Sequence, residues 1–492
     1  MDVSFNRFVR RLAVISILSS ILFVCPVHSQ ESPLAAARKL LKQGQPQDAL
    51  AILLDLRRSE PSNADLCQQI GIAYTQLQDF PQAERFYREA VRLNPQFWGV
   101  RSNLGTVLWF MDRHDESERE FLAVAKAHPD DPVPHLYLGL AAEAHREFLR
   151  AKGEFVKAGA LASDNPEVLP AVLESYLASR DLSFPEKAAK QLTSAENPDP
   201  ILASRVGALF LQYGYPDRAA AVFERLTAAH TESAEMWRML AEAYDRASKA
   251  EEAYHAYSRA VEAAPNSEES YIAFADFASA HGNNDYGLEV VAKGLQRLPG
   301  SPGLLCERGL LCALKGDRSR AESSFIEASR LKPNWALPFL ALGISQLESG
   351  DPASAAGSFQ NAQSVEPHDF RTHYLYALAL TKKGNNGAEA VIALRKAIEL
   401  NSQDARPHTL LGQLLLAEER PNEAASEWER ALRIDPENQT ALYQLGLLCR
   451  KQGKTERAER LLETLRHVKE KTRSNEQSLV QILRVVPEKR VP

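Results

Sequence analysis

The chain has 492 residues, of which 45% are hydrophobic and 25% are charged, and its formal net charge is −6. This is the composition of a globular protein, and it disfavours a disordered chain, a collagen and a membrane protein with many spans. Binding nucleic acid by charge needs clustered lysine and arginine, which this mildly acidic chain does not supply, so no nucleic-acid partner is expected.

Residues 1–29 have the pattern of an export signal. A basic segment contains Arg7, Arg10 and Arg11, and the thirteen residues from Leu12 to Val24 carry no charge and are mostly apolar. A membrane-spanning helix needs about 20 such residues, whereas this shorter length is typical of the core of a signal peptide. We therefore expect cleavage after Ser29 and export of the mature chain, either to a periplasm or out of the cell.

Two alternatives to cleavage stay open. The segment could remain as an uncleaved anchor, or Cys25 could carry a lipid that anchors the chain. The residue before Cys25 is Val24, which is larger than the glycine, alanine or serine usual at a lipidation site.

The remaining cysteines are expected to be small buried residues. They are Cys67, Cys306, Cys312 and Cys449. No CxxC pair is present, so the sequence does not indicate a structural zinc site.

Prolines recur along the chain at a spacing of 34 residues. This step separates Pro95 from Pro129 and repeats three times between Pro265 and Pro367. Proline lacks an N–H and disfavours helix at the residue before it, so each of these prolines is expected to follow the end of a helix.

A second pattern has the same period. A small residue stands twenty-four positions before each repeat-ending position, another usually follows twelve later, and a large residue usually comes four after that, as in Gly343, Ala355 and Phe359. Two antiparallel helices cross closely only where side chains are small, and the large residue fills the space beside the crossing. Each unit is therefore expected to be helix, turn, helix.

These motifs resemble the tetratricopeptide repeat family. The segment Gly71-Ile72-Ala73-Tyr74, followed by Ala83, Tyr87, Ala90 and Pro95, matches the family pattern closely. The resemblance implies an all-α fold, a right-handed α-solenoid superhelix of about thirteen helix-turn-helix repeats that together cover nearly all of the mature chain.

The phase of the repeat divides the chain into segments. Regular repeats are expected over 30–165 and 201–470, with a degenerate repeat over 166–200 that is either a joint in the superhelix or a mere irregularity. One extra residue occurs around Gly384–Gly387. The basic tail, 471–492, is expected to finish a capping helix and then fray; the alternative is a short basic docking peptide.

The sequence carries no signature of catalysis. HExxH, GxxxxGK[ST], GxGxxG and GxSxG are all absent from it. No catalytic residue, metal ligand or cofactor is therefore expected, and the chain is not expected to be an enzyme.

The resemblance also implies a concave groove lined by the first helix of each repeat. Family geometry places four first-helix positions there, six and three residues before the small residue and one and four after it. The resulting candidate partner-binding residues are Leu310, Leu340, Ile344, Leu347, Arg371, Tyr374, Leu378 and Arg406. The apolar members are either a binding stripe, suited with the arginines to an acidic amphipathic helix, or part of the packed core. The Lys and Asn set of family members that clamp a C-terminal carboxylate is absent.

The sequence thus predicts a non-catalytic protein-binding scaffold of the cell envelope, with a protein or peptide partner in its groove. An alternative is an assembly or export factor in polysaccharide secretion, or in outer-membrane or pilus biogenesis. Membrane association through an envelope complex and self-association are both compatible with this prediction.

Overall fold

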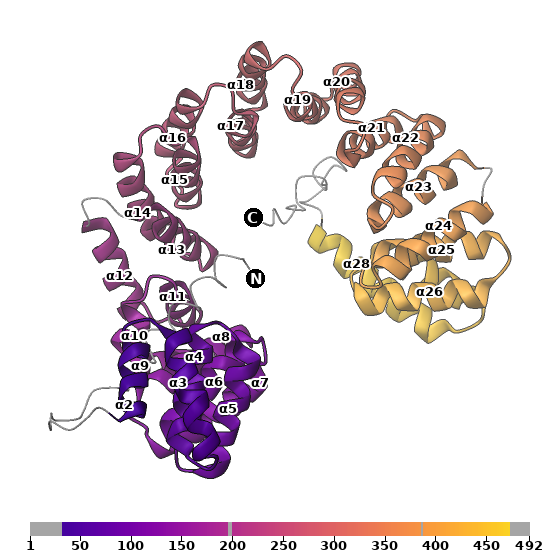
Figure 1. The fold of residues 1–492 in the computed structure, drawn as a ribbon. Helices are drawn as coiled ribbons and strands as arrows, with labels where there is room; N and C mark the ends of the chain where they lie inside the picture. Colours follow the sequence, from indigo (N-terminus) through magenta and orange to yellow (C-terminus); the bar gives the residue numbers. More distant parts are fainter. Residues whose placement is uncertain (1–31, 195–198, 385–386, 473–492) are drawn as a thin grey trace. The chain divides into compact units, whose positions relative to one another are not determined.

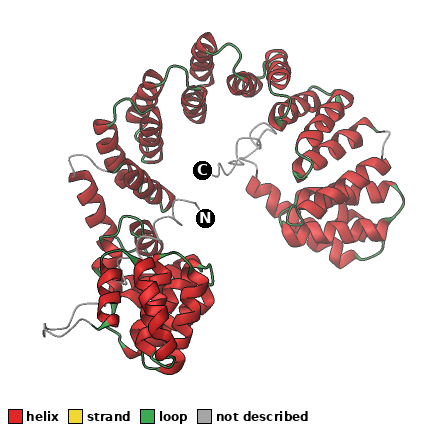
Figure 2. Cartoon of the chain, in the orientation of Figure 1, coloured by secondary structure: helices red, strands yellow, loops and turns green. Residues whose placement is uncertain are grey.

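The computed structural model describes residues 32–194, 199–384 and 387–472, and every regular element in these ranges is an α-helix (Figure 2). The predicted signal peptide, 1–29, lies outside the described residues, as does nearly all of the predicted tail, 471–492. The all-α expectation is confirmed. Among the described helices, none combines the length and the apolar composition that crossing a bilayer requires.

The chain divides into two compact units. The first holds the residues up to 231 together with 239–253, and the second holds 232–238 and the residues from 254 onward. The division falls within α15 (Ala234–Arg246) and α16 (Ala250–Ala263).

The first unit is a series of helices that pack in consecutive pairs (Figure 1). Its helices are α2 (Pro33–Lys42), α3 (Pro46–Ser59), α4 (Ala64–Gln76), α5 (Phe80–Leu93), α6 (Trp98–Phe110), α7 (His114–Ala127), α8 (Pro132–Ala144), α9 (Phe148–Ala158), α10 (Ala160–Ser163), α11 (Leu169–Ala178), α12 (Ser183–Ser194), α13 (Pro200–Gln212) and α14 (Pro216–Ala229).

The second unit continues the same arrangement. Its helices are α17 (Glu268–Ala280), α18 (Asn284–Arg297), α19 (Pro302–Leu314), α20 (Arg318–Leu331), α21 (Ala336–Glu348), α22 (Pro352–Val365), α23 (Phe370–Lys383), α24 (Gly387–Leu400), α25 (Ala405–Ala417), α26 (Pro421–Ile434), α27 (Gln439–Lys451) and α28 (Thr455–Thr472). In most pairs the first helix has 13 residues and the second has 14. This regularity follows from the 34-residue period.

In seven described pairs, a glycine of the first helix meets an aromatic residue sixteen positions later. A Cβ added to Gly343 would lie 2.5 Å from Cε1 of Phe359, closer than two carbon atoms can approach, and Phe359 is fully buried. Glycine faces an aromatic ring in the same way at Gly71, Gly105, Gly139, Gly207, Gly309 and Gly412. The predicted pairing of small and large residues is confirmed at these crossings.

Helix ends lie where the proline and capping residues place them. Helices α5, α7, α20 and α26 each end two residues before a repeat proline, as predicted. After α7 and α26 the next helix begins at a side chain that accepts one of its free N–H groups, as when Asn438 Oδ1 accepts a hydrogen bond from the Ala441 N–H at 3.0 Å; α6 and α21 begin without such a cap. The short link between two repeats therefore stops one helix and starts the next.

Structural irregularity begins at the end of the segment 30–165, which was predicted to be regular, and continues into the degenerate repeat 166–200. Helix α9 ends at Ala158 and is followed by Gly159, with φ 57° and ψ −132°, and then by the four-residue α10. Helices α11 and α12 still pack together, but they have only 10 and 12 residues. Whether 166–200 acts as a joint stays a prediction.

A single methyl group at a crossing tests this packing. Gly343→Ala is expected to lower the free energy of unfolding by about 1–3 kcal/mol, because the added Cβ would overlap the buried Phe359 ring and force it to shift. Gly357 is the matched control: it lies in the interior of α22, and a Cβ there meets nothing within 4 Å. Gly357→Ala is expected to raise stability by about 0.5–1 kcal/mol. Urea denaturation measures both, and a harmless Gly343→Ala would contradict the proposed crossing.

Candidate partner-binding surface

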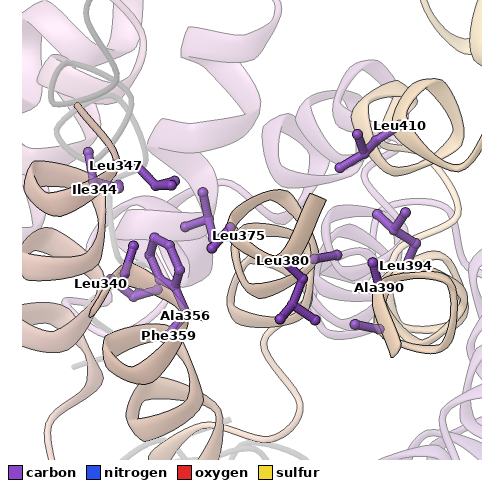
Figure 3. Packing of buried hydrophobic residues seen from close by; sticks show 14 of the residues in the cluster. Leu340, Ile344, Leu347, Ala356, Phe359, Leu375, Leu380, Ala390, Leu394 and Leu410 are labelled. Atoms are coloured by element: carbon purple, nitrogen blue, oxygen red, sulfur yellow. The ribbon is translucent and has the colours of Figure 1, made fainter. Parts of the chain in front are cut away.

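Four of the eight predicted groove residues are buried in the core of the second unit. Leu340 and Ile344 are 2% exposed, Leu347 is 5% and Leu310 is 8%. Figure 3 shows Leu340, Ile344 and Leu347 beside the buried side chains of α22 and α23. Of the two alternatives that the sequence left open, burial favours core packing for these four residues.

Tyr374 and Leu378 of α23 are partly buried against the same core. The structure brings Tyr374 together with a third predicted residue, because the guanidinium carbon of Arg406 lies 5.3 Å from the centre of the Tyr374 ring. Burial raises the pKa of Tyr374, so its ring stays neutral beneath the cation. This contact links α23 to α25.

The two predicted arginines are already paired. Arg371 Nε lies 2.8 Å from Asp369 Oδ2, and Arg406 Nη2 lies 2.5 Å from Asp404 Oδ2. These aspartates also cap the N-termini of α23 and α25, and the hydrogen bond with Asp404 raises the pKa of Arg406 above its ordinary value. The arginines therefore neutralise helix caps, which weakens the expectation that they attract an acidic partner.

Exposed apolar residues lie two repeats further along the same face. Leu416 of α25 is 36% exposed, and Tyr443 and Leu447 of α27 are 46% and 40% exposed. Arg450 is also exposed and makes no ion pair within the described ranges. We call these four residues the C-terminal row; the two helices that carry them are in contact.

The sequence rule that selected the groove residues also selects the C-terminal row. Leu416 stands four after Gly412, and Tyr443, Leu447 and Arg450 stand three before, one after and four after Gly446. The predicted groove residues end at Arg406, before these positions. The sequence does not show which of these positions are exposed to solvent. Equivalent positions are buried in α21 and exposed in α27.

Other chemistry is sparse. All four cysteines of the described chain are buried free thiols, as predicted, and burial raises the pKa of Cys306. Within the described ranges, no three side chains of the metal-binding types come together.

The fold defines a helical-repeat protein. Models of the tetratricopeptide repeat match residues 34–97, 209–268 and 340–405, and a second model of the same repeat matches 415–480, together about half of the chain. The chain belongs to the tetratricopeptide repeat proteins. Such proteins are in general non-catalytic scaffolds for protein or peptide partners.

Solved structures with the same kind of fold include several repeat proteins. Yeast Tom70 is 16% identical, with 86% of this chain and 94% of that chain covered and a TM-score of 0.39. Cut9, in the complex Cut9–Hcn1, is also 16% identical, with 89% and 98% covered and a TM-score of 0.38. Pseudomonas aeruginosa PilF is 21% identical, with 43% and 95% covered and a TM-score of 0.37. No curated protein sequence matches the chain significantly.

Burial predicts opposite results for two leucines of this face. Leu340→Ala is expected to cost about 2–5 kcal/mol of folding free energy, because it leaves a cavity in the core. Leu447→Ala removes a side chain that is already 40% exposed, so a change within about 0.5 kcal/mol is expected. Urea denaturation of both variants checks this. Equal destabilisation would show that Leu447 is part of the core too.

Proposed function

We propose that this chain is an exported, non-catalytic scaffold of the cell envelope that holds a segment of a partner protein on the C-terminal row. The observation that carries the proposal is the exposure of Leu416, Tyr443 and Leu447 on two contacting helices, where repeats nearer the middle of the second unit bury the same positions. Neighbouring exposed apolar residues of this kind mark interaction sites.

The chemistry of the row indicates what it holds. Three apolar side chains suit the apolar face of an amphipathic helix. Arg450, which has no ion pair in the described part of the chain, supplies the cation that Arg371 and Arg406 do not. The partner segment is thus apolar on one face, with a carboxylate near Arg450.

The predicted groove residues support this surface. Arg371, Tyr374, Leu378 and Arg406 lie on the neighbouring helices α23 and α25 and fix them through the Tyr374–Arg406 contact. The buried residues Leu310, Leu340, Ile344 and Leu347 hold α19 and α21 in the same unit.

A matched pair of variants tests partner binding. Leu447→Glu places a charge in the row and is expected to weaken partner capture at least about tenfold, the loss typical of a binding hot spot. Leu149→Glu is the control, since Leu149 on α9 is 78% exposed and lies outside the row. The measurement is capture from cells by a photo-crosslinking residue at Tyr443, with thermal melting to verify folding. Equal capture by both variants and the wild type would contradict the proposal.

Export is supported by the N-terminal pattern alone: three arginines followed by the uncharged segment Leu12–Val24. The mature protein is expected to begin at Gln30, and the mass of the protein purified from its native cells measures this. A mass equal to that of the full chain would contradict cleavage, and a lipid-modified N-terminus at Cys25 would assign an anchored form.

The narrower role of an envelope assembly or export factor rests on export together with the length of the array; deletion of the gene should then alter the envelope or its surface polymer.

A further inference from the structure

Several repeats share a hydrogen bond that closes the turn between them. The residue four positions before the small residue of the first helix donates to the carbonyl of the proline six positions before the donor. His135 Nε2 lies 2.9 Å from the Pro129 oxygen, and His373 Nε2 lies 2.9 Å from the Pro367 oxygen. Arg101 and Tyr271 make the same bond to Pro95 and Pro265, each at 3.2 Å.

His408 on α25 occupies this position but does not make this bond. The residue six positions earlier is Ser402, not proline. His408 Nδ1 lies 2.6 Å from Glu427 Oε2, and only 5% of its side chain is exposed. In the part of the chain that the structure describes, its Nε2 has no hydrogen-bond partner. His135 has the same contact on Nδ1, to Glu154 at 2.5 Å, but its Nε2 is engaged. His408 is therefore a buried side chain whose Nε2 has no hydrogen-bond partner within the described residues.

A cavity of about 440 Å³ lies at this turn. It is lined by Ser402 and Gln403 of the turn, His408 of α25, and Arg430 and Arg433 of α26. A serine side chain is smaller than the proline ring that stands here in other repeats, so Ser402 leaves space beside the histidine. The volume is in the range of small-molecule sites.

Two of the five polar residues that line the cavity are arginines. Arg433 makes no ion pair within the described residues. Arg430 Nη1 holds Glu427 Oε1 at 2.8 Å, which leaves its other guanidinium nitrogens available. Glu427 is the carboxylate in contact with His408, and its two oxygens are used by His408 and Arg430. Arg433 is thus the guanidinium group of this lining that has no carboxylate partner among the described residues, and Arg430 keeps nitrogens free beside it.

We propose that this cavity binds the oxyanion group, carboxylate or phosphate, of a small acidic molecule. Guanidinium nitrogens donate hydrogen bonds to such groups in a fixed fork geometry, and the His408 ring lines the same space. Two isoleucines, Ile398 and Ile434, complete the lining and suit the hydrocarbon part of the ligand. None of the four residues of the C-terminal row lines the cavity, so this site is independent of the proposed partner surface.

The probes are sodium succinate, observed by 1H NMR, and sodium phosphate, observed by 31P NMR, each titrated against the full chain. Sodium chloride keeps the ionic strength constant, so that screening does not imitate binding. Saturable binding of at least one probe is expected, with a Kd on the order of 1 mM or tighter. Succinate binding alone assigns a carboxylic acid, and phosphate binding alone assigns a phosphate compound. Binding of neither would overturn the proposal.

Three variants test the location. Ser402→Pro restores the proline of the other repeats and should narrow the cavity beside His408. Arg433→Gln removes the cation that has no ion pair. Each variant should weaken binding at least about tenfold. Arg330→Gln is the matched control, because Arg330 is exposed and stands three residues before Pro333, as Arg433 stands three before Pro436. It should bind like the wild type. Unchanged affinity in Arg433→Gln, or an equal loss in Arg330→Gln, would overturn the proposal; thermal melting verifies that each variant is folded.

Discussion

The close crossing of two helices, with a glycine against an aromatic ring sixteen residues later, is the interaction on which the rest of this structure depends. It fixes how the first helix lies on the second in seven described pairs, as with Gly343 on Phe359 and Gly412 on Trp428. Because the glycine offers no side chain, the ring fills the space that a Cβ would take, and the pair closes without a void. Every surface described above is a consequence of where that crossing places the remaining first-helix positions.

Repetition of this crossing allows the units to differ elsewhere. Neither Leu340 nor Leu447 takes part in the glycine–aromatic crossing. Leu340 is buried in the core, whereas Leu447 is 40% exposed. Likewise His373 closes its turn through Pro367, whereas His408 faces a cavity beside Ser402. The functional features of the second unit are therefore departures from the repeat, made at positions that the crossing leaves unconstrained.

The two predicted groove arginines form their ion pairs at the ends of their own helices. Arg371 and Arg406 pair with Asp369 and Asp404, which cap the helices that carry the arginines. Pairs of this kind on the protein surface contribute little to stability, but they remove the arginine as a free cation for a partner. Arg450 and Arg433 differ in having no such aspartate, and for this reason the two proposed sites contain them.

The sequence by itself determined the helical pairs, their boundaries and the small-to-large contacts, because these depend on local residue types at a fixed 34-residue spacing. It also predicted which positions of the first helices share one helix face. It did not decide which of those positions is open to solvent: Leu340 and Leu447 are both leucines, and only the packing of neighbouring helices buries one and exposes the other. The cavity at His408 was likewise decided by tertiary structure, since it depends on residues of α24, α25 and α26 meeting around a turn that lacks its proline.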